Sequence, residues 1–131
     1  MKDLNKSTCI LLLGGVGSRY SNINEPPKQL IKIYKRTLIE NILIHLKKNG
    51  INNFILPLGY KKDYFYKFFK TKKKIGKYYI KLSKEIDENM GSKSINLNLF
   101  DAGKNTTKLT RIKMKNLYKY AEILFNADVL K

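Results

Sequence analysis

The sequence predicts an α/β protein with a mostly parallel sheet and helices packed on it. Apolar strand-like runs occur at 8–13 and 54–56, and a run at 95–99 alternates leucine or isoleucine with asparagine. Helical patterns at 37–48 and 61–70 separate these runs. Strands that alternate with helices favour parallel pairing, and ligands of such sheets bind beyond the carboxyl ends of the strands. With 131 residues, the chain is expected to form one domain with its own core.

The first helix has clear start and stop signals. Thr37 and Glu40 have the spacing of a capping box, in which each side chain satisfies a backbone N–H of the other residue. Asn49-Gly50 is a typical helix end, and basic residues precede it. We expect the apolar face of this helix to consist of Leu38, Ile42 and Leu46, widened by Ile39 and Leu43.

The remaining elements follow the same reasoning. We expect an extended segment at 30–33, a basic loop or frayed helix end at 70–77, an edge strand at 78–82, a polar turn at 87–94, a helix at 108–121 and a last strand at 123–125.

The net charge of +17 is extreme and has two explanations. It could serve electrostatic binding to nucleic acid or another polyanion. It could equally reflect compositional drift, because the chain is crowded with Lys, Ile, Asn and Tyr. Arginine, the side chain best suited to clamp phosphates, occurs only at 19, 36 and 111. We therefore favour drift, and nucleic acid is not the expected partner.

Other compositional features exclude several classes of protein. Cys9 is the single cysteine, so neither an intrachain disulfide nor a thiolate metal cluster can form. No apolar run approaches the roughly 20 residues of a membrane span. The N-terminus lacks the apolar stretch of a signal peptide. The expected location is the cytoplasm, with no membrane partner.

A glycine-rich loop at 14–28 follows the first apolar run. Its glycines allow the backbone to approach a ligand and to turn N–H groups toward an anion. Arg19 lies within the loop and Lys28 ends it, after Pro26-Pro27. The pattern is neither a P-loop nor a dinucleotide fingerprint, but it predicts a phosphate-binding loop.

Several motifs in order resemble one enzyme family. Leu12–Arg19 followed by Pro27-Lys28 resembles the signature of sugar-nucleotide nucleotidyltransferases, Gly-Gly-x-Gly-Thr/Ser-Arg and then Pro-Lys. Within that family, the glucose-1-phosphate cytidylyltransferases are the most similar. Their segments are matched in order by Gly59-Tyr60-Lys61, Phe100–Thr106, Arg111–Lys113 and Phe125–Asp128. The resemblance implies a Rossmann-like, glycosyltransferase-A-like nucleotidyltransferase fold with helices on both faces of the sheet.

The resemblance also implies a reaction. The phosphate of a sugar 1-phosphate would attack the α-phosphorus of a nucleoside triphosphate, with CTP favoured, and pyrophosphate would leave. Such chemistry needs charge neutralisation and alignment. Arg19 and Lys28 would be the catalytic residues. Backbone N–H groups of Gly14, Gly15, Gly17 and Ser18 would hold the triphosphate, Arg111 would help to bind the nucleotide, and Asp128 would hold Mg²⁺.

The chain also departs from the family pattern. Leu109-Thr110 stands where the family has two glycines before the arginine, and Ala127 replaces a glycine before Asp128. The family domain is longer, so the chain is expected to match its N-terminal half and to be truncated at the C-terminus, with impaired activity. A complementary chain could supply the missing half, and a homo-oligomer could cover the apolar face of an open sheet.

We interpret the weaker candidates for functional residues as structural residues. We expect His45 on a helix surface, Cys9 in the core, the aromatic residues of 64–69 in packing contacts and Asp101 in a turn. Two alternatives to the enzyme remain open. One is a non-catalytic basic module that binds nucleotide, RNA or another polyanion. The other is a remnant that folds poorly because an open sheet leaves an apolar face uncovered.

Overall fold

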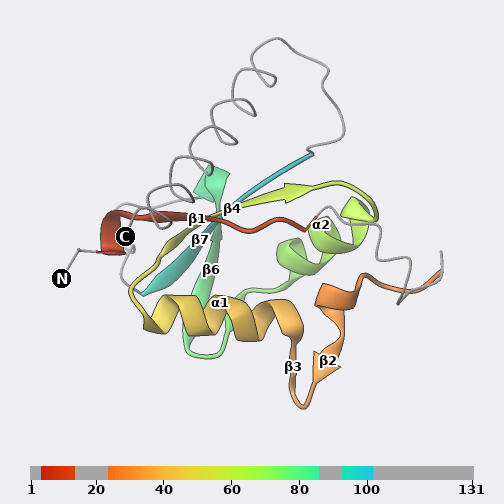
Figure 1. Cartoon of the computed structure of the whole chain (residues 1–131), viewed down its shortest axis with the longest axis horizontal. Helices are drawn as coiled ribbons and strands as arrows, with labels where there is room; N and C mark the ends of the chain where they lie inside the picture. Colours follow the sequence, from red (N-terminus) through yellow and green to blue (C-terminus); the bar gives the residue numbers. More distant parts are fainter. Residues whose placement is uncertain (1–3, 14–23, 86–92, 102–131) are drawn as a thin grey trace, which may run out of the picture.

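The computed structural model describes residues 4–13, 24–85 and 93–101, which form one central sheet with helices (Figure 1). The sheet has the strand order β1-β4-β7-β6-β5. Its strands are β1 Thr8–Ile10, β4 Asn53–Leu58, β5 Lys74–Ile75, β6 Tyr78–Leu82 and β7 Ser94–Asp101. The two α-helices of the described residues are α1 Leu38–Lys48 and α2 Lys62–Thr71. Short 3-10 turns occur at η1 Leu4–Lys6, η2 Lys28–Leu30 and η3 Ser83–Glu85.

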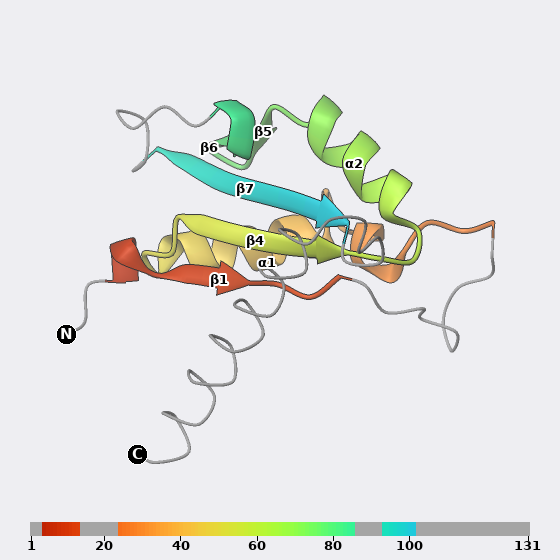
Figure 2. The same cartoon turned by 90° about the horizontal axis from the view of Figure 1, so that it is seen from above.

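Parallel pairing dominates the sheet, as the sequence predicts. β4 pairs in parallel with β1 and with β7, and β7 pairs in parallel with β6. Within this five-stranded sheet, the short edge strand β5 alone is antiparallel to its neighbour, β6, among the described strands. Figure 2 shows β1, β4 and β7 running in the same direction, so their carboxyl ends lie at one edge of the sheet.

The two faces of the sheet differ in polarity. Residues paired in register share a face, so the pairs Phe54–Leu97 and Ile80–Ile95 mark the core side. All four of these side chains are buried. The opposite face carries the pair Asn53–Asn96, in which the Asn96 amide donates to Asn53 Oδ1 at 2.9 Å. The predicted alternation of β7 is therefore confirmed, although Asn96 itself is buried and hydrogen-bonded rather than solvated.

Helix α1 begins and ends where the sequence predicts. The Glu40 N–H donates to Thr37 Oγ1 at 3.3 Å, and the Thr37 N–H donates to Glu40 Oε2 at 2.6 Å, which completes the capping box. After the C-cap Asn49, Gly50 has a φ of 95°, a left-handed value that suits glycine.

The predicted apolar face of α1 is confirmed at Ile39 and Leu43, but its predicted centre needs correction. Ile39, Leu43 and Ile44 are buried, whereas Leu38, Ile42 and Leu46 are only partly buried. The buried stripe is therefore turned by about one residue, or about 100° around the helix axis. The apolar residues form such a wide arc that periodicity alone did not define its centre.

The second helix packs through its phenylalanines. Phe65 and Phe69 are buried and belong to the same core cluster as Ile39 and Leu43 of α1. The packing interpretation of the aromatic segment is thus confirmed for these two rings. Tyr64 stays partly exposed, with 38% of its surface accessible.

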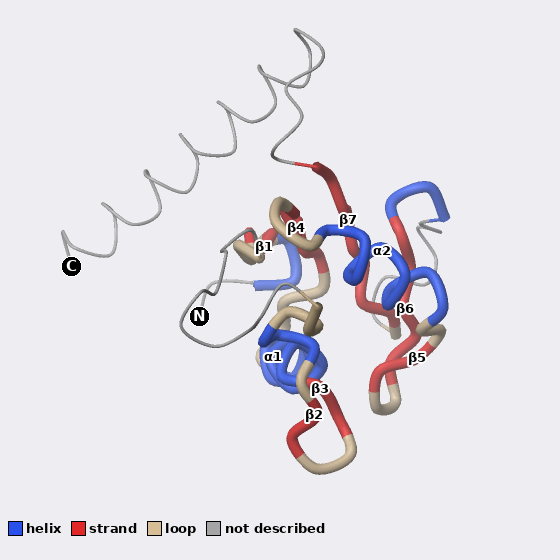
Figure 3. The backbone as a smooth tube through the Cα atoms, turned by 90° about the vertical axis from the view of Figure 1, so that its right-hand side faces the viewer, coloured by secondary structure: helices blue, strands red, loops and turns tan. Residues whose placement is uncertain are grey.

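Three predicted segments differ from the structure. Residues 70–77 are not all loop, because Lys74–Ile75 forms β5 and makes β6 an internal strand instead of the predicted edge. Leu30 belongs to η2 rather than to an extended run. The extended part of that run is β2 Lys32–Ile33, which forms a hairpin with β3 Arg36–Thr37. Figures 1 and 3 show this hairpin extending from the N-terminal end of α1, away from the sheet.

Some predicted elements lie outside the described residues. These are the glycine segment 14–23, most of the turn at 87–94, the helix at 108–121 and the strand at 123–125. The expectation of helices on both sheet faces therefore stays a prediction, because α1 and α2 contribute to one core cluster. Neither described α-helix has the length and apolar character of a bilayer-spanning helix.

Candidate functional site at the carboxyl edge of the sheet

The carboxyl ends of β1, β4 and β7 meet at one edge of the sheet, where parallel α/β proteins bind ligands. Beyond β1 the chain stays hydrogen-bonded to β4, since the Leu13 N–H donates to the Pro57 carbonyl at 3.3 Å. Leu13 is the last described residue before the glycine-rich segment. The described chain therefore reaches this edge at Leu13, directly before the predicted phosphate loop.

The turn between β4 and α2 carries the Gly59-Tyr60-Lys61 motif. Lys61 is the N-cap of α2 and has left-handed backbone angles, with φ 59° and ψ 30°. The turn is closed by the Lys62 N–H, which donates to the Gly59 carbonyl at 3.1 Å, and by the Tyr64 N–H, which donates to the Lys61 carbonyl at 3.2 Å. The Lys61 ammonium lies 5.5 Å from the centre of the partly exposed Tyr60 ring.

Lys28 is the one predicted catalytic residue within the described part of the chain. It begins η2 directly after the buried Pro27, and its own side chain is exposed. The Leu30 N–H donates to the Pro27 carbonyl at 2.9 Å, which fixes the turn that presents Lys28. The ammonium of Lys61 donates to the carbonyl of Glu25, so the segment that leads into Lys28 is joined to the β4–α2 turn.

Asp101 and Lys62 form an ion pair at the same edge. The sequence predicted Asp101 as a turn residue at a strand end; it is the last residue of β7, and its contact with Lys62 was not predicted. Tyr66 lies one turn further along α2, and its pKa is raised by burial and by the carboxylate of Asp101. Two signals in the sequence could have predicted this ion pair. One is the lysine in the first turn of a helix, and the other is the aspartate at the end of a parallel strand.

The other predicted site residues lie outside the described residues: Gly14, Gly15, Gly17, Ser18, Arg19, Arg111 and Asp128. Within the described ranges, no cluster of three or more His, Cys, Asp or Glu side chains suits a metal ion. Lys28 and Lys61 add positive charge near the strand ends, whereas the charge of Lys62 is balanced by Asp101. Such a surface suits phosphate groups better than it suits a metal ion.

The weaker candidates keep their structural interpretations. His45 is exposed on α1, which confirms a helix-surface position. Cys9 is partly buried and packs against the core. Burial raises the pKa of the Cys9 thiol, which disfavours the reactive thiolate.

Comparison with known proteins gives two partial matches. The chain is 39% identical over 57 residues to a choline-phosphate cytidylyltransferase of Streptococcus pneumoniae, covering 43% of this chain and 25% of the relative. It is 37% identical over 62 residues to a D-glycero-alpha-D-manno-heptose 1-phosphate guanylyltransferase of Campylobacter jejuni, covering 47% of this chain and 28% of the relative. No protein-family model and no solved structure matches the chain.

Both relatives are nucleotidyltransferases. The partial matches support a sugar-nucleotidyltransferase family for this chain, in agreement with the motifs. The matched segments cover only about a quarter of the length of each relative. The two names differ in the nucleotide, cytidylyl in one and guanylyl in the other, so the similarity extends to the enzyme class and leaves the base open.

Proposed function

We propose that this chain is the nucleotide-binding part of a nucleotidyltransferase. The reaction transfers a nucleotidyl group, CMP being favoured, from a nucleoside triphosphate to a sugar 1-phosphate and releases pyrophosphate. One contact carries the proposal, because it joins two of the motif segments. The ammonium of Lys61, in the Gly-Tyr-Lys turn, donates a hydrogen bond to the backbone carbonyl of Glu25, shortly before Pro27-Lys28. The kinship to two nucleotidyltransferases supports it.

The described edge can supply part of the chemistry. An acceptor phosphate oxygen forms a bond to the α-phosphorus while the bond to the bridging oxygen of pyrophosphate breaks. Both groups are anionic, so their approach requires cationic neutralisation. Lys28 is proposed to contact the α-phosphate or the acceptor phosphate, and its exposure leaves it accessible to either. Lys61, at the adjoining turn, adds a second positive charge.

The remaining roles rest on the resemblance alone. Arg19 would neutralise the β- and γ-phosphates, and the backbone of 14–18 would cradle them. Arg111 would assist in nucleotide binding. Asp128 carries a carboxylate, the ligand type that Mg²⁺ prefers, and a bound Mg²⁺ would neutralise phosphate charge.

The names of both relatives indicate acceptors of the same chemical class. Choline phosphate and heptose 1-phosphate are phosphate monoesters, although only the second is a sugar. The preference for CTP rests on the Gly59-Tyr60-Lys61 resemblance, and one relative is a cytidylyltransferase. GTP is the competing donor because the other relative is a guanylyltransferase.

Calorimetric titration with CTP, GTP, UTP and ATP in the presence of Mg²⁺ tests the proposal. We expect saturable binding of at least one nucleotide, with CTP the tightest. Lys28→Ala should weaken that binding about tenfold, since a hydrogen bond to a charged group contributes roughly 1.5–3 kcal/mol. Lys67→Ala, which removes an exposed lysine from α2, is the matched control and should change the affinity less than twofold. Absence of binding by all four nucleotides would reject the proposal.

The net charge supports a second candidate, a non-catalytic module that binds RNA or another polyanion. Its affinity would fall steeply with salt, with a log–log slope set by the number of phosphates contacted. A titration of a single-stranded RNA at several salt concentrations separates the two candidates. A slope near zero would exclude the module.

A further inference from the structure

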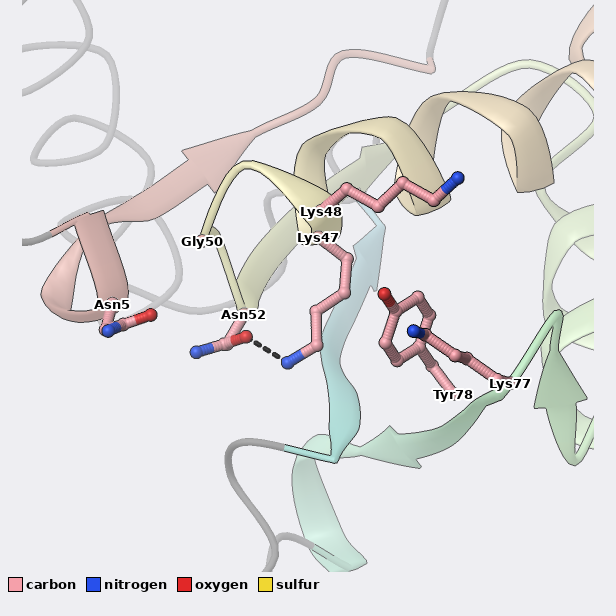
Figure 4. A pocket seen from close by; sticks show the side chains of 7 residues that line it. All are labelled: Asn5, Lys47, Lys48, Gly50, Asn52, Lys77 and Tyr78. Carbon is pink, nitrogen blue, oxygen red and sulfur yellow. Dashed lines mark hydrogen bonds between the residues drawn. The ribbon is translucent and has the colours of Figure 1, made fainter.

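A second basic site lies at the amino end of the strands, away from the edge described above. A pocket of about 370 Å³ lies there, and Figure 4 shows the side chains that line it. This volume falls within the range of about 300–1,000 Å³ that is typical of small-molecule sites. Its polar side chains come from η1, the end of α1, the start of β4 and the β5–β6 turn: Asn5, Lys47, Lys48, Asn52, Lys77 and Tyr78.

Lys47 is the most constrained side chain of the pocket. Only 7% of its surface is accessible, although a lysine at a helix end usually extends into water. Its ammonium donates to Asn52 Oδ1 and lies 5.6 Å from the centre of the Tyr78 ring. Burial lowers the pKa of Lys47, because a desolvated ammonium is disfavoured. A positive charge is thus held in a partly dehydrated position beside an open pocket.

Lys77 approaches the same ring from another element. Its ammonium lies 5.5 Å from the centre of the Tyr78 ring, and Figure 4 shows both residues on the pocket wall. The preceding Gly76 has a φ of 59°, a value that lets the tight β5–β6 turn form. The chain thereby brings lysines together from segments about 30 positions apart, as the residue numbers 47 and 77 show.

The usual role of lysines at a helix C-terminus does not account for this arrangement. Three of the terminal carbonyls of α1 are already satisfied: those of His45 and Leu46 accept from the Asn49 N–H, and that of Lys47 accepts from the Gly50 N–H at 3.0 Å. The Asn49 side chain also donates to the His45 carbonyl at 2.8 Å. The helix end is therefore capped by backbone and asparagine donors, and the lysine ammoniums are directed elsewhere.

We propose that this pocket binds the phosphate group of a small anion. All three charged side chains that line it are lysines, and Asn5 and Asn52 add amide donors. Lysine ammoniums act as point charges that suit the tetrahedral phosphate, and amide N–H groups complete its hydrogen bonds. The site is separate from the proposed nucleotide edge, because β4 runs from Asn53 beside this pocket to Leu58 at the other edge. Six residues of strand span roughly 20 Å.

Free phosphate ions and phosphate esters share this chemistry, so the experiment has two arms with free ions and one arm with an ester. Backbone amide shifts of ¹⁵N-labelled protein are followed during titration with inorganic phosphate, pyrophosphate or ribose 5-phosphate at constant ionic strength. We expect saturable shifts at Gly50 and Tyr78 with at least one of them. The compound that binds most tightly shows whether the pocket prefers a free phosphate ion or a phosphate ester. Shifts that do not saturate with any of the three compounds would overturn the proposal.

Charge variants locate the site. Lys77→Ala should weaken the binding measured at Gly50 about tenfold, whereas Lys67→Ala should change it less than twofold. Lys47→Met keeps the buried stem and removes the charge, and it should abolish saturation; if it fails to fold, Lys77→Ala decides alone. Lys28→Ala should leave binding at this pocket intact, so failure of the nucleotide proposal and failure of this one give different results. Equal weakening by Lys77→Ala and Lys67→Ala would contradict a specific pocket.

Discussion

Lys62, the first residue of α2, forms an ion pair with Asp101, the last residue of β7, across 39 positions of sequence. Asp101 lies opposite Leu58 in the register of β4 and β7. The ion pair therefore fixes the start of the helix that follows β4 against the end of the neighbouring strand. This contact orders the carboxyl edge, where Lys28 and the Gly59-Tyr60-Lys61 turn also lie.

The charges of this ion pair should control the ionisation of Tyr66. Burial is the largest cause of its raised pKa, Asp101 raises it further, and Lys62 lowers it. Asp101→Asn should therefore lower the Tyr66 pKa while leaving it above the ordinary value, and Lys62→Gln should raise it. A ¹³Cζ titration of labelled tyrosine, with the Tyr66 signal assigned by Tyr66→Phe, measures both shifts.

Asp63→Asn is the matched control for that experiment. Asp63 also raises the Tyr66 pKa, but less than Asp101 does. The neutral asparagine should therefore produce the smaller decrease at position 63. An equal decrease of the Tyr66 pKa in Asp63→Asn and Asp101→Asn would show that the ion pair does not control the ionisation of Tyr66. Changes of the same sign in Lys62→Gln and Asp101→Asn would show the same.

Loss of the capping box should destabilise the protein moderately. Thr37→Ala removes the hydroxyl that accepts from the Glu40 N–H, at a cost of about 1 kcal/mol in the free energy of unfolding. Thr71→Ala is the matched control, because the Thr71 hydroxyl donates to carbonyls of its own helix at an exposed position. Urea denaturation of both variants should give a change below about 0.5 kcal/mol for Thr71→Ala. Equal losses would contradict the capping role.

Glu40 should make stability depend on pH. Burial of the carboxylate would raise its pKa, but the Lys72 ammonium and the Thr37 N–H hold it below the ordinary 4.5. A lowered folded-state pKa means that the stabilising contribution is complete above about pH 4.5 and is lost as the pH falls through the folded-state pKa. Glu40→Gln should thus be less stable than wild type at pH 7, and the difference should shrink in acid.

Denaturation curves from pH 7 to pH 3 measure that difference. Glu25→Gln is the matched control, since Glu25 is exposed whereas only 3% of the Glu40 surface is accessible. Its stability should stay close to that of wild type at neutral pH. A constant gap between wild type and Glu40→Gln over the whole range would contradict the lowered pKa.

Two leucines of α1 test which face of the helix is buried. Leu43 is fully buried, whereas Leu46 is partly exposed. Leu43→Ala should cost about 2–5 kcal/mol because it removes buried methyl groups and leaves a cavity. Leu46→Ala, the same change one turn further on, should cost clearly less. The urea midpoints of the two variants measure this difference in stability. A larger loss of stability for Leu46→Ala than for Leu43→Ala would support the helix face whose centre was predicted from periodicity.

Local signals in the sequence were sufficient for much of the fold. The capping box of Thr37 and Glu40 and the Asn49-Gly50 end gave the bounds of α1, because they depend on contacts within four residues. The alternation of Ile95 and Leu97 with asparagines gave β7. β5 was missed because the two residues Lys74-Ile75 are too short a segment to carry a periodic signal, and they become a strand only by pairing with β6.

The sequence likewise predicted only part of the candidate site. The sequence by itself determined the motif residues, Lys28 and Gly59-Tyr60-Lys61 among them, and the parallel sheet that sends strand ends to one edge. Only the tertiary structure decided that Lys61 reaches the Glu25 carbonyl, that Lys62 pairs with Asp101 and that Lys47 and Lys77 flank Tyr78. The physical reason is that these contacts join segments brought together by burial of a shared core, and their geometry depends on packing rather than on local propensity.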